Sequence, residues 1–203
     1  HVNYREKPFE VSAFIQDKAE YDYLVMNVGL RFDYFDPNSQ ILSDYGRPQT
    51  SERLSTKPEW QISPRIGLAY PISTEGVFHV AYGHFFQVPA FQFLYTNPDY
   101  TYDPESGLGR VFGNPQLKAQ QTVSYEFGLR QGFYETMTLS MTAFYKDIRN
   151  LLGSRIEVIQ PGFDEPFPLS RYGRYVNRDY GQVKGVLLEA NRRMTDGFSF
   201  TFS

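Results

Sequence analysis

The stretch Leu24-Val25-Met26-Asn27-Val28-Gly29-Leu30-Arg31-Phe32-Asp33-Tyr34 alternates between apolar and polar side chains. Successive side chains of a β-strand point to opposite faces, so the apolar members share one face. The other face holds Asn27, Gly29, Arg31 and Asp33, with Val25 as the apolar exception. The pattern predicts a β-strand with one apolar face and one face that carries charges in mid-strand.

The same two-residue period recurs along the chain. It is clearest from Val123 to Arg130 and from Met137 to Ala143, where apolar residues again alternate with polar residues or glycine. Weaker versions occupy residues 9–17, 66–70, 78–86, 183–191 and 198–202. Helical spacing is nearly absent, so the pattern predicts an all-β chain of about eight antiparallel strands.

The expected connections alternate in length. Short turns are predicted near residues 20–23, 71–76, 131–135 and 195–197, and long loops near 37–61, 87–121 and 150–176. Loops longer than about 15 residues are uncommon in compact soluble domains. Short turns at one end and long loops at the other are typical of outer-membrane barrels, with the turns periplasmic and the loops extracellular. The arrangement favours a section of an antiparallel transmembrane β-barrel.

The composition argues against nucleic-acid binding and against cysteine-based sites. The 203 residues carry a formal net charge of −3, which gives no general attraction to nucleic acid, and they contain no cysteine. Aromatic residues make up 17% of the chain. Many of them gather near expected strand ends, as in the aromatic girdles of membrane barrels. Alternation alone also fits a soluble antiparallel sandwich, so that alternative stays open here.

Five segments, taken in chain order, resemble the TonB-dependent outer-membrane receptors. They are Asn27–Tyr34, Tyr82–Phe91 with Leu94-Tyr95, the loop Gly113-Asn114-Pro115-Gln116-Leu117-Lys118 leading into Ser124–Leu129, Tyr145–Ile148, and Lys184–Val186. Together they cover most of the chain from about residue 24 to residue 190. The chain departs from the family pattern at Ala119-Gln120, where Pro-Glu is usual, and at Gln87, where Arg is usual.

This resemblance implies that residues 1–203 form a section of one barrel domain of about 22 strands. The plug domain and the rest of the barrel are then expected outside these residues. The implied function is import of a scarce nutrient across the outer membrane of a Gram-negative type bacterium. Its expected partners are outer-membrane lipid, the plug domain, the TonB complex and a nutrient (a siderophore, oligosaccharide, cobalamin-like compound or peptide), but no nucleic acid.

Two other functions compete with this interpretation. One is a small complete eight-stranded outer-membrane barrel with a structural or adhesion role. The other is a secreted carbohydrate-binding β-sandwich. The small barrel predicts that these residues refold alone in detergent into a protease-resistant unit, whereas the sandwich predicts a water-soluble monomer that binds sugar saturably.

Residues 91–112 are the predicted ligand-binding loop. Flat rings with interspersed hydrogen-bonding groups suit a sugar, a chelate or a peptide, and the candidates are Phe93, Tyr95, Asn97, Tyr100, Tyr102, Arg110 and Phe112. The competing role for each ring is packing within the loop. The predicted lumen-facing residues are Asn27, Arg31, Asp33, Glu126 and Arg130. They either pair across strands, line the ligand path or contact a plug.

Catalytic and metal sites are not expected. His79 and His84 are five residues apart, so on one strand they face opposite sides and cannot chelate one metal together. The sequence contains no nucleophile elbow, no His-Glu-x-x-His motif and no P-loop. We therefore expect neither an enzyme nor a cofactor.

Overall fold

The computed structural model describes residues 5–48, 50–98, 111–134, 136–158, 171–193 and 199–202. Strands dominate them, and the elements are β1 (Phe9–Tyr21), β2 (Leu24–Asp36), β3 (Gln40–Leu42), β4 (Arg53–Ser55), β5 (Glu59–Pro71), β6 (Gly76–Gln87), α1 (Phe91–Tyr95), β7 (Val111–Phe112), β8 (Gln120–Phe133), β9 (Met137–Val158), β10 (Arg171–Arg193) and β11 (Ser199–Phe202). No helix within these ranges is both long and apolar enough to cross a membrane.

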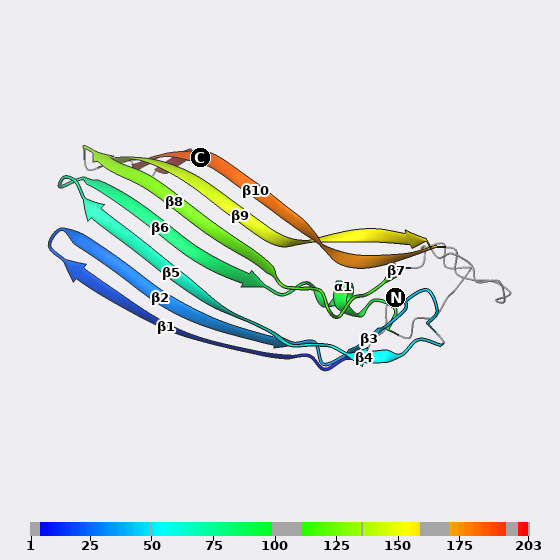
Figure 1. The fold of residues 1–203 in the computed structure, drawn as a ribbon. Helices are drawn as coiled ribbons and strands as arrows, with labels where there is room; N and C mark the ends of the chain where they lie inside the picture. The colour runs from blue at the N-terminus through cyan, green and yellow to red at the C-terminus, as the bar shows by residue number, and fades with distance from the viewer. Residues whose placement is uncertain are drawn as a thin grey trace.

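The long strands form one curved antiparallel sheet (Figure 1). Its order is β1-β2-β5-β6-β8-β9-β10-β11, so sequence neighbours are also spatial neighbours. Strand β7 pairs with β10 in parallel, and β3 with β4 forms a separate hairpin. Short turns meet at one end of the sheet, and the long connections gather at the other, which we call the loop end. Every strand expected from the alternation is present.

The prediction for residues 150–176 was wrong over much of its length. Strand β9 continues to Val158 and β10 begins at Arg171, so the two form a hairpin that extends far beyond the other strands. The glycines and prolines of this segment suggested a loop, but backbone pairing between the two strands outweighs their low strand propensity. The other long connections hold short elements, namely β3, β4, α1 and β7.

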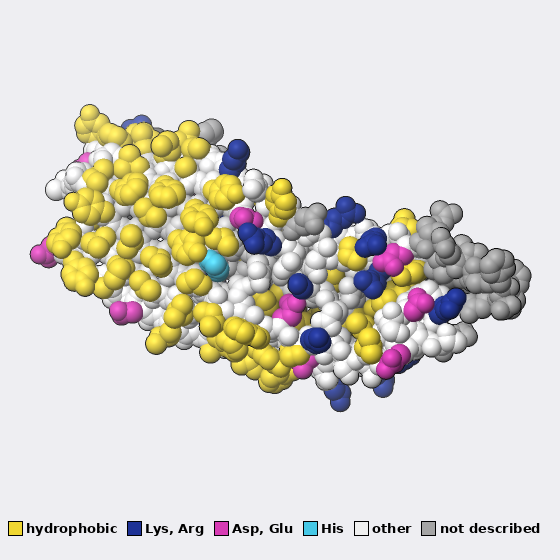
Figure 2. All heavy atoms as spheres, viewed as in Figure 1, with side chains coloured by type: hydrophobic (Ala, Val, Ile, Leu, Met, Phe, Trp, Pro, Cys, Tyr) yellow, Lys and Arg dark blue, Asp and Glu magenta, His cyan; other side chains and the backbone are white. Residues whose placement is uncertain are grey.

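Exposure along the sheet is the reverse of that in a soluble protein. In β2, Leu30 is 49% exposed whereas Asp33 is only 6% exposed. In β8, Phe127 is 52% exposed and Ser124 5% exposed. Figure 2 shows the hydrophobic side chains covering the half of the sheet nearer the short turns, while charged side chains gather toward the loop end. An apolar outer face with sheltered polar groups behind it is what a wall facing lipid requires.

The sheet does not close on itself. Among the described residues, β1 pairs only with β2, and β11 pairs only with β10. The only other sheet they form is the small β3–β4 hairpin. A complete eight-stranded barrel would join the two edge strands, and a sandwich would cover one face with a second large sheet. Neither arrangement is seen, and the open curved sheet fits a section of a larger barrel.

Buried apolar residues lie at the loop end. One cluster consists of Leu42, Tyr45, Phe112 and Tyr172, and we call it the outer loop core. The other consists of Phe35, Leu94, Tyr95 and Leu117, and we call it the inner loop core. Each cluster joins residues that are distant in sequence, so the two cores hold the long connections together against the strand ends.

Candidate functional site

The segment Gly113–Ala119 is fastened to the loop end by side-chain amides. The Nδ2 of Asn114 donates to the carbonyl oxygen of Tyr175 at 2.9 Å. The amide of Asn177 brackets Lys118, since its Oδ1 accepts from the Lys118 N–H at 2.8 Å and its Nδ2 donates to the Lys118 carbonyl at 2.9 Å. We call this set of contacts the amide clasp. It explains why a loop with little regular structure has a defined position.

Gly113 occupies a position where a side chain has no room. A Cβ atom there would lie 2.5 Å from both the Leu94 carbonyl oxygen and the Thr96 backbone nitrogen. The close approach permits two backbone bonds, from the Gly113 N–H to Thr96 at 2.7 Å and from the Asn114 N–H to Phe93 at 3.0 Å. Glycine is therefore required where the clasp meets α1.

Glu59 completes the clasp at the loop end of β5. Its Oε2 accepts a hydrogen bond from the Ala119 N–H at 2.8 Å. Burial raises the pKa of the Glu59 carboxyl above its usual range, although this hydrogen bond and the nearby Lys118 charge act in the opposite direction. The carboxyl therefore anchors the backbone from a poorly solvated position.

The outer loop core combines stacked rings with charge. The Tyr45 and Tyr172 rings stack at 6.1 Å with an interplanar angle of 18°, and the Arg174 guanidinium lies 4.7 Å from the Tyr45 ring centroid. The Tyr172 hydroxyl donates to the Glu157 carboxylate. Burial, followed by this hydrogen bond and the Glu157 charge, raises the pKa of Tyr172 above its usual range. The phenol therefore stays a neutral hydrogen-bond donor.

The predicted ligand-binding residues separate into three groups. Tyr95 and Asn97 line a polar cavity of about 540 Å³ between α1, the β3–β4 hairpin and the segment before β1. We call it the loop cavity. Phe93 packs edge-on against Tyr175, and Phe112 is buried in the outer loop core. The others, Tyr100, Tyr102 and Arg110, lie outside the described residues.

The rings with known positions serve mainly to pack the loops. Tyr95 is buried, and its hydroxyl donates to the Pro37 carbonyl oxygen at 2.9 Å. Phe112 is buried as well. Ligand contact by these residues stays a prediction, and within the structure Tyr95 and Phe112 support the walls of the site.

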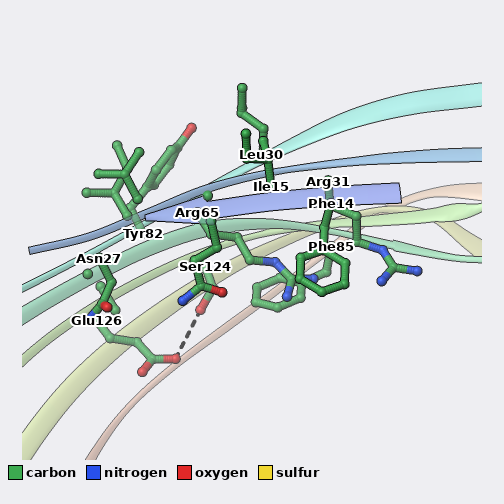
Figure 3. Close-up of a pocket in the computed structure, with 17 residues that line it drawn as sticks. Phe14, Ile15, Asn27, Leu30, Arg31, Arg65, Tyr82, Phe85, Ser124 and Glu126 are labelled. Atoms are coloured by element: carbon green, nitrogen blue, oxygen red, sulfur yellow. Dashed lines mark hydrogen bonds between the residues drawn. The ribbon is translucent and has the colours of Figure 1, made fainter. Parts of the chain in front are cut away.

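A second hollow, also of about 540 Å³, lies mainly on the inner face of the sheet (Figure 3). Two neighbouring rows of paired residues form its floor. One row runs Asn27, Gly67, Ala81, Glu126, and the next runs Gly29, Arg65, Gly83, Ser124. Small residues between the polar ones leave the space open, so we call it the inner-wall hollow.

The inner-wall hollow contains both positively and negatively charged side chains. The Arg65 guanidinium lies 4.8 Å from the centroid of the Phe85 ring, and the Ser124 hydroxyl donates to Glu126 at 3.2 Å. Figure 3 shows Leu30 and Tyr82 pointing away from these groups, on the other side of the strands. The inner wall thus presents a cation and an anion across a shallow polar surface.

The register places the predicted lumen-facing residues on one face of the sheet. Asn27, Arg31 and Glu126 line the inner-wall hollow. Asp33 is bound by Arg31, whose Nε lies 2.8 Å from one carboxylate oxygen and 3.0 Å from the other. Arg130 lies outside the hollow, nearer the short turns. These residues therefore share one face of the sheet, and their predicted places along a lumen, on a ligand path or against a plug stay predictions.

Sequence reasoning missed Arg65 as a residue of the inner-wall hollow, and it missed the close packing of His79 against Gly128. Arg65 follows Pro64 in a weakly alternating strand, and its importance becomes visible only once Gly29 and Gly83 are known to flank it. His79 lies directly opposite Gly128, where a Cβ would come within 2.2 Å of its ring. His84 faces the other side, and its Nε2 lies 2.6 Å from the Tyr82 hydroxyl. The expectation that the two histidines face opposite sides is confirmed.

A family model described as TonB dependent receptor-like, beta-barrel, matches residues 2–203. The chain belongs to this family. The receptor's sheet is therefore a section of an outer-membrane β-barrel wall of a Gram-negative bacterium, with its apolar face toward lipid. The long connections lie on the extracellular side, as the family architecture and their length both indicate.

Solved receptor structures share this fold. The hemophore receptor HasR of Serratia marcescens, solved with its hemophore HasA and heme, superposes with a TM-score of 0.70 at 19% identity, over 93% of this chain and 32% of that one. The FrpB iron transporter of Neisseria meningitidis gives 0.60 at 16% identity, over 94% and 25%. The ferric enterobactin receptor PfeA of Pseudomonas aeruginosa gives 0.59 at 16% identity, over 98% and 35%.

The receptor chain therefore spans about a third or less of the length of these solved proteins. Identities this low carry the fold and not the ligand. No curated protein sequence matches the chain significantly. The ligand must accordingly be argued from the loop end of this receptor itself.

Proposed function

We propose that residues 1–203 are one section of the barrel domain of an outer-membrane nutrient-uptake receptor. The plug domain and the remaining strands lie outside these residues. The observation that carries the proposal is the reversed exposure of the sheet, with apolar side chains outside and charged groups in a hollow inside. Such a wall suits a protein that holds a polar passage within the membrane.

In this function the loop end captures the nutrient. The two loop cores and the amide clasp hold the described parts of the extracellular loops in one arrangement before a ligand arrives. A preorganised site loses less conformational freedom on binding than a disordered one. The loop cavity offers polar contacts, and the inner-wall hollow lies below it on the lumen side.

Transport by this receptor requires no covalent chemistry. In the proposed cycle, a plug domain blocks the passage, and the TonB complex supplies the work that releases the nutrient inward. The residues of the inner-wall hollow present weak, reversible contacts of both charges. Such contacts suit either a docked plug or a ligand in transit, because neither must be held permanently.

The neighbours in fold handle different cargo. Their names refer to a hemophore with heme, to iron, to ferric enterobactin and, for OprC, to copper. We infer for this receptor the shared operation, which is capture of a scarce nutrient outside the cell and its import. A soluble lectin would not need a lipid-facing wall, and a complete eight-stranded adhesion barrel would join β1 to β11, which do not pair among the described residues.

Nutrient depletion from the medium tests the proposal. Strains with the intact gene, without it, and without TonB are grown on defined medium, and the extracellular compounds are compared by mass spectrometry. Uptake of at least one compound should be lost equally in the two deletion strains. Unchanged uptake of every compound after deletion of the receptor gene would contradict a transport role, as would uptake that continues without TonB.

A further inference from the structure

The loop cavity is lined by five separate segments, and polar side chains from four of them make up most of its lining. Glu6 comes from the segment before β1, and Asp36 and Asn38 come from the end of β2 and the turn that follows. Ser55 comes from β4, and Asn97 from the turn after α1. Its volume of about 540 Å³ lies within the range of small-molecule sites. Convergence of several segments on one polar space is typical of a binding site.

Part of the hydrogen-bonding capacity of the lining is already used. The Asn38 side chain donates to the Lys7 carbonyl at 3.0 Å, and Asp36 Oδ1 accepts from the Asn38 N–H at 2.8 Å. By contrast, the Glu6 carboxylate and the Ser55 hydroxyl make no hydrogen bond to any other described residue. These two groups, with the second carboxylate oxygen of Asp36, are available to an incoming molecule.

The charge of the lining selects against anions. Among its described residues are two carboxylates, Glu6 and Asp36, and one guanidinium, that of Arg53, which is already engaged within the protein. An anionic chelate would meet a net negative surface and would have to displace the existing contact of Arg53. Apolar ligands are disfavoured as well, because entering the cavity would leave the carboxylates and hydroxyls without partners.

We propose that the loop cavity binds a neutral, hydroxyl-rich ligand, namely one or two sugar units of an uncharged glycan. This inference rests on the proposed uptake function and names the class of its substrate. A sugar hydroxyl both donates and accepts, so it can donate to Glu6 or Asp36 while accepting from Ser55. Hydrogen bonds to an ionised carboxylate are the stronger ones, which gives the two acids the main part in recognition.

Glycan-array binding by the detergent-solubilised full-length receptor tests the proposal. The array carries neutral and acidic glycans, and a ferric catecholate is offered in a separate titration. We expect binding to neutral glycans only. The double variant Glu6→Ala/Ser55→Ala should bind at least about tenfold more weakly, a loss of about 1.4 kcal/mol, because it removes an ionised acceptor and a hydroxyl from the lining. Glu52→Ala is the control: Glu52 directly precedes β4 but does not line the cavity, so this variant should bind like the parent.

Heat-modifiable migration on gels confirms that each variant keeps its barrel. Absence of neutral-glycan binding, binding confined to the ferric catecholate or acidic glycans, or equal binding by parent and double variant would each overturn the cavity assignment. TonB-dependent uptake of an anionic compound would then leave the transport function standing without the sugar specificity. Neutral-glycan binding without any TonB-dependent uptake would support the sugar specificity of the cavity and contradict the transport function.

Discussion

The wall and the loop end of this receptor are stabilised in opposite ways. In the wall, large apolar side chains such as Leu30 and Phe127 are exposed, and polar ones such as Asp33 and Ser124 are sheltered. At the loop end, Leu94, Tyr95 and Phe112 are buried as they would be in a soluble domain. One chain thus follows two rules of burial, because one part is solvated by lipid and the other by water.

This difference teaches where a substitution will matter. At the loop end, a lost side chain leaves a cavity or an unpaired polar group, as in any aqueous core. In the wall, lipid replaces a missing methyl group, but it cannot solvate a charge. Four comparisons separate the two rules, and they follow in decreasing order of the larger effect expected in each.

Gly113→Ala should have the largest effect. The added methyl group would meet the backbone of Leu94 and Thr96 at 2.5 Å, so α1 and the clasp could not both keep their positions. We expect the loop end to lose more than about 4 kcal/mol of local stability, a size reached by few single substitutions. Limited proteolysis of the loops in the full-length receptor would measure it. Gly67→Ala, where a Cβ would meet only the Asn27 side chain at 3.9 Å, is the matched control in the wall.

Leu94→Ala and Leu30→Ala compare the same deletion under the two rules. Leu94 is fully buried in the inner loop core, so its truncation should destabilise the loop end by about 2–5 kcal/mol. Leu30 faces lipid, and its truncation should alter stability by less than about 1 kcal/mol. Hydrogen exchange of the Gly113 and Asn114 amides reports the first change, and heat-modifiable migration the second. Similar effects of both truncations would mean that the wall has an ordinary core.

Phe127→Arg tests the lipid contact directly. A cation on the lipid face of a membrane barrel is destabilising by about 2–4 kcal/mol at mid-depth. We expect poor assembly into lipid vesicles, measured as the fraction of receptor that resists protease. Glu126→Gln, one residue away on the inner face, should assemble normally. Normal assembly of Phe127→Arg would show that this face is not in the membrane.

The comparison built on Asn177→Ala should show a smaller effect than the three before it. This substitution removes three hydrogen bonds of the amide clasp, to the Lys118 N–H, the Lys118 carbonyl and the Asn150 carbonyl. Water can replace part of what is lost, so we expect about 1–3 kcal/mol. Faster hydrogen exchange at Lys118 would show it. Asn191→Ala changes an amide on the same strand that makes no side-chain hydrogen bond to a described residue, and exchange at Lys118 should stay at the parent rate.

The wall could be predicted from sequence because its information is local. Alternation from Leu24 to Tyr34 and from Val123 to Arg130 specifies which face each side chain occupies, and the register confirms that assignment. Family resemblance then supplied the kind of barrel. The inner-wall hollow could not be predicted because it depends on the pairing of Arg65 between Gly29 and Gly83. The sequence of a single strand does not specify which residues of its neighbours it pairs with.

The loop end resisted prediction for a different reason. The sequence predicts Tyr95 and Phe112 as ligand-binding rings, because an aromatic residue that packs and one that binds look the same in sequence. Their burial depends on contacts with Phe35 and Tyr172, which are far away in sequence. The extension of β9 and β10 was missed because glycine and proline near residues 153–173 obscured a pairing that only the hairpin geometry makes favourable.

The unpaired side of β1 has a practical consequence for anyone who expresses these residues alone. Among the described residues, no strand pairs with that side of β1, and Phe14 and Ile15 are exposed on its opposite faces. A long strand with an unpaired edge is a template for pairing with another extended segment. In water, copies of this chain should polymerise edge to edge and precipitate, so recovery from inclusion bodies, followed by micelles, is the sensible route to purified material.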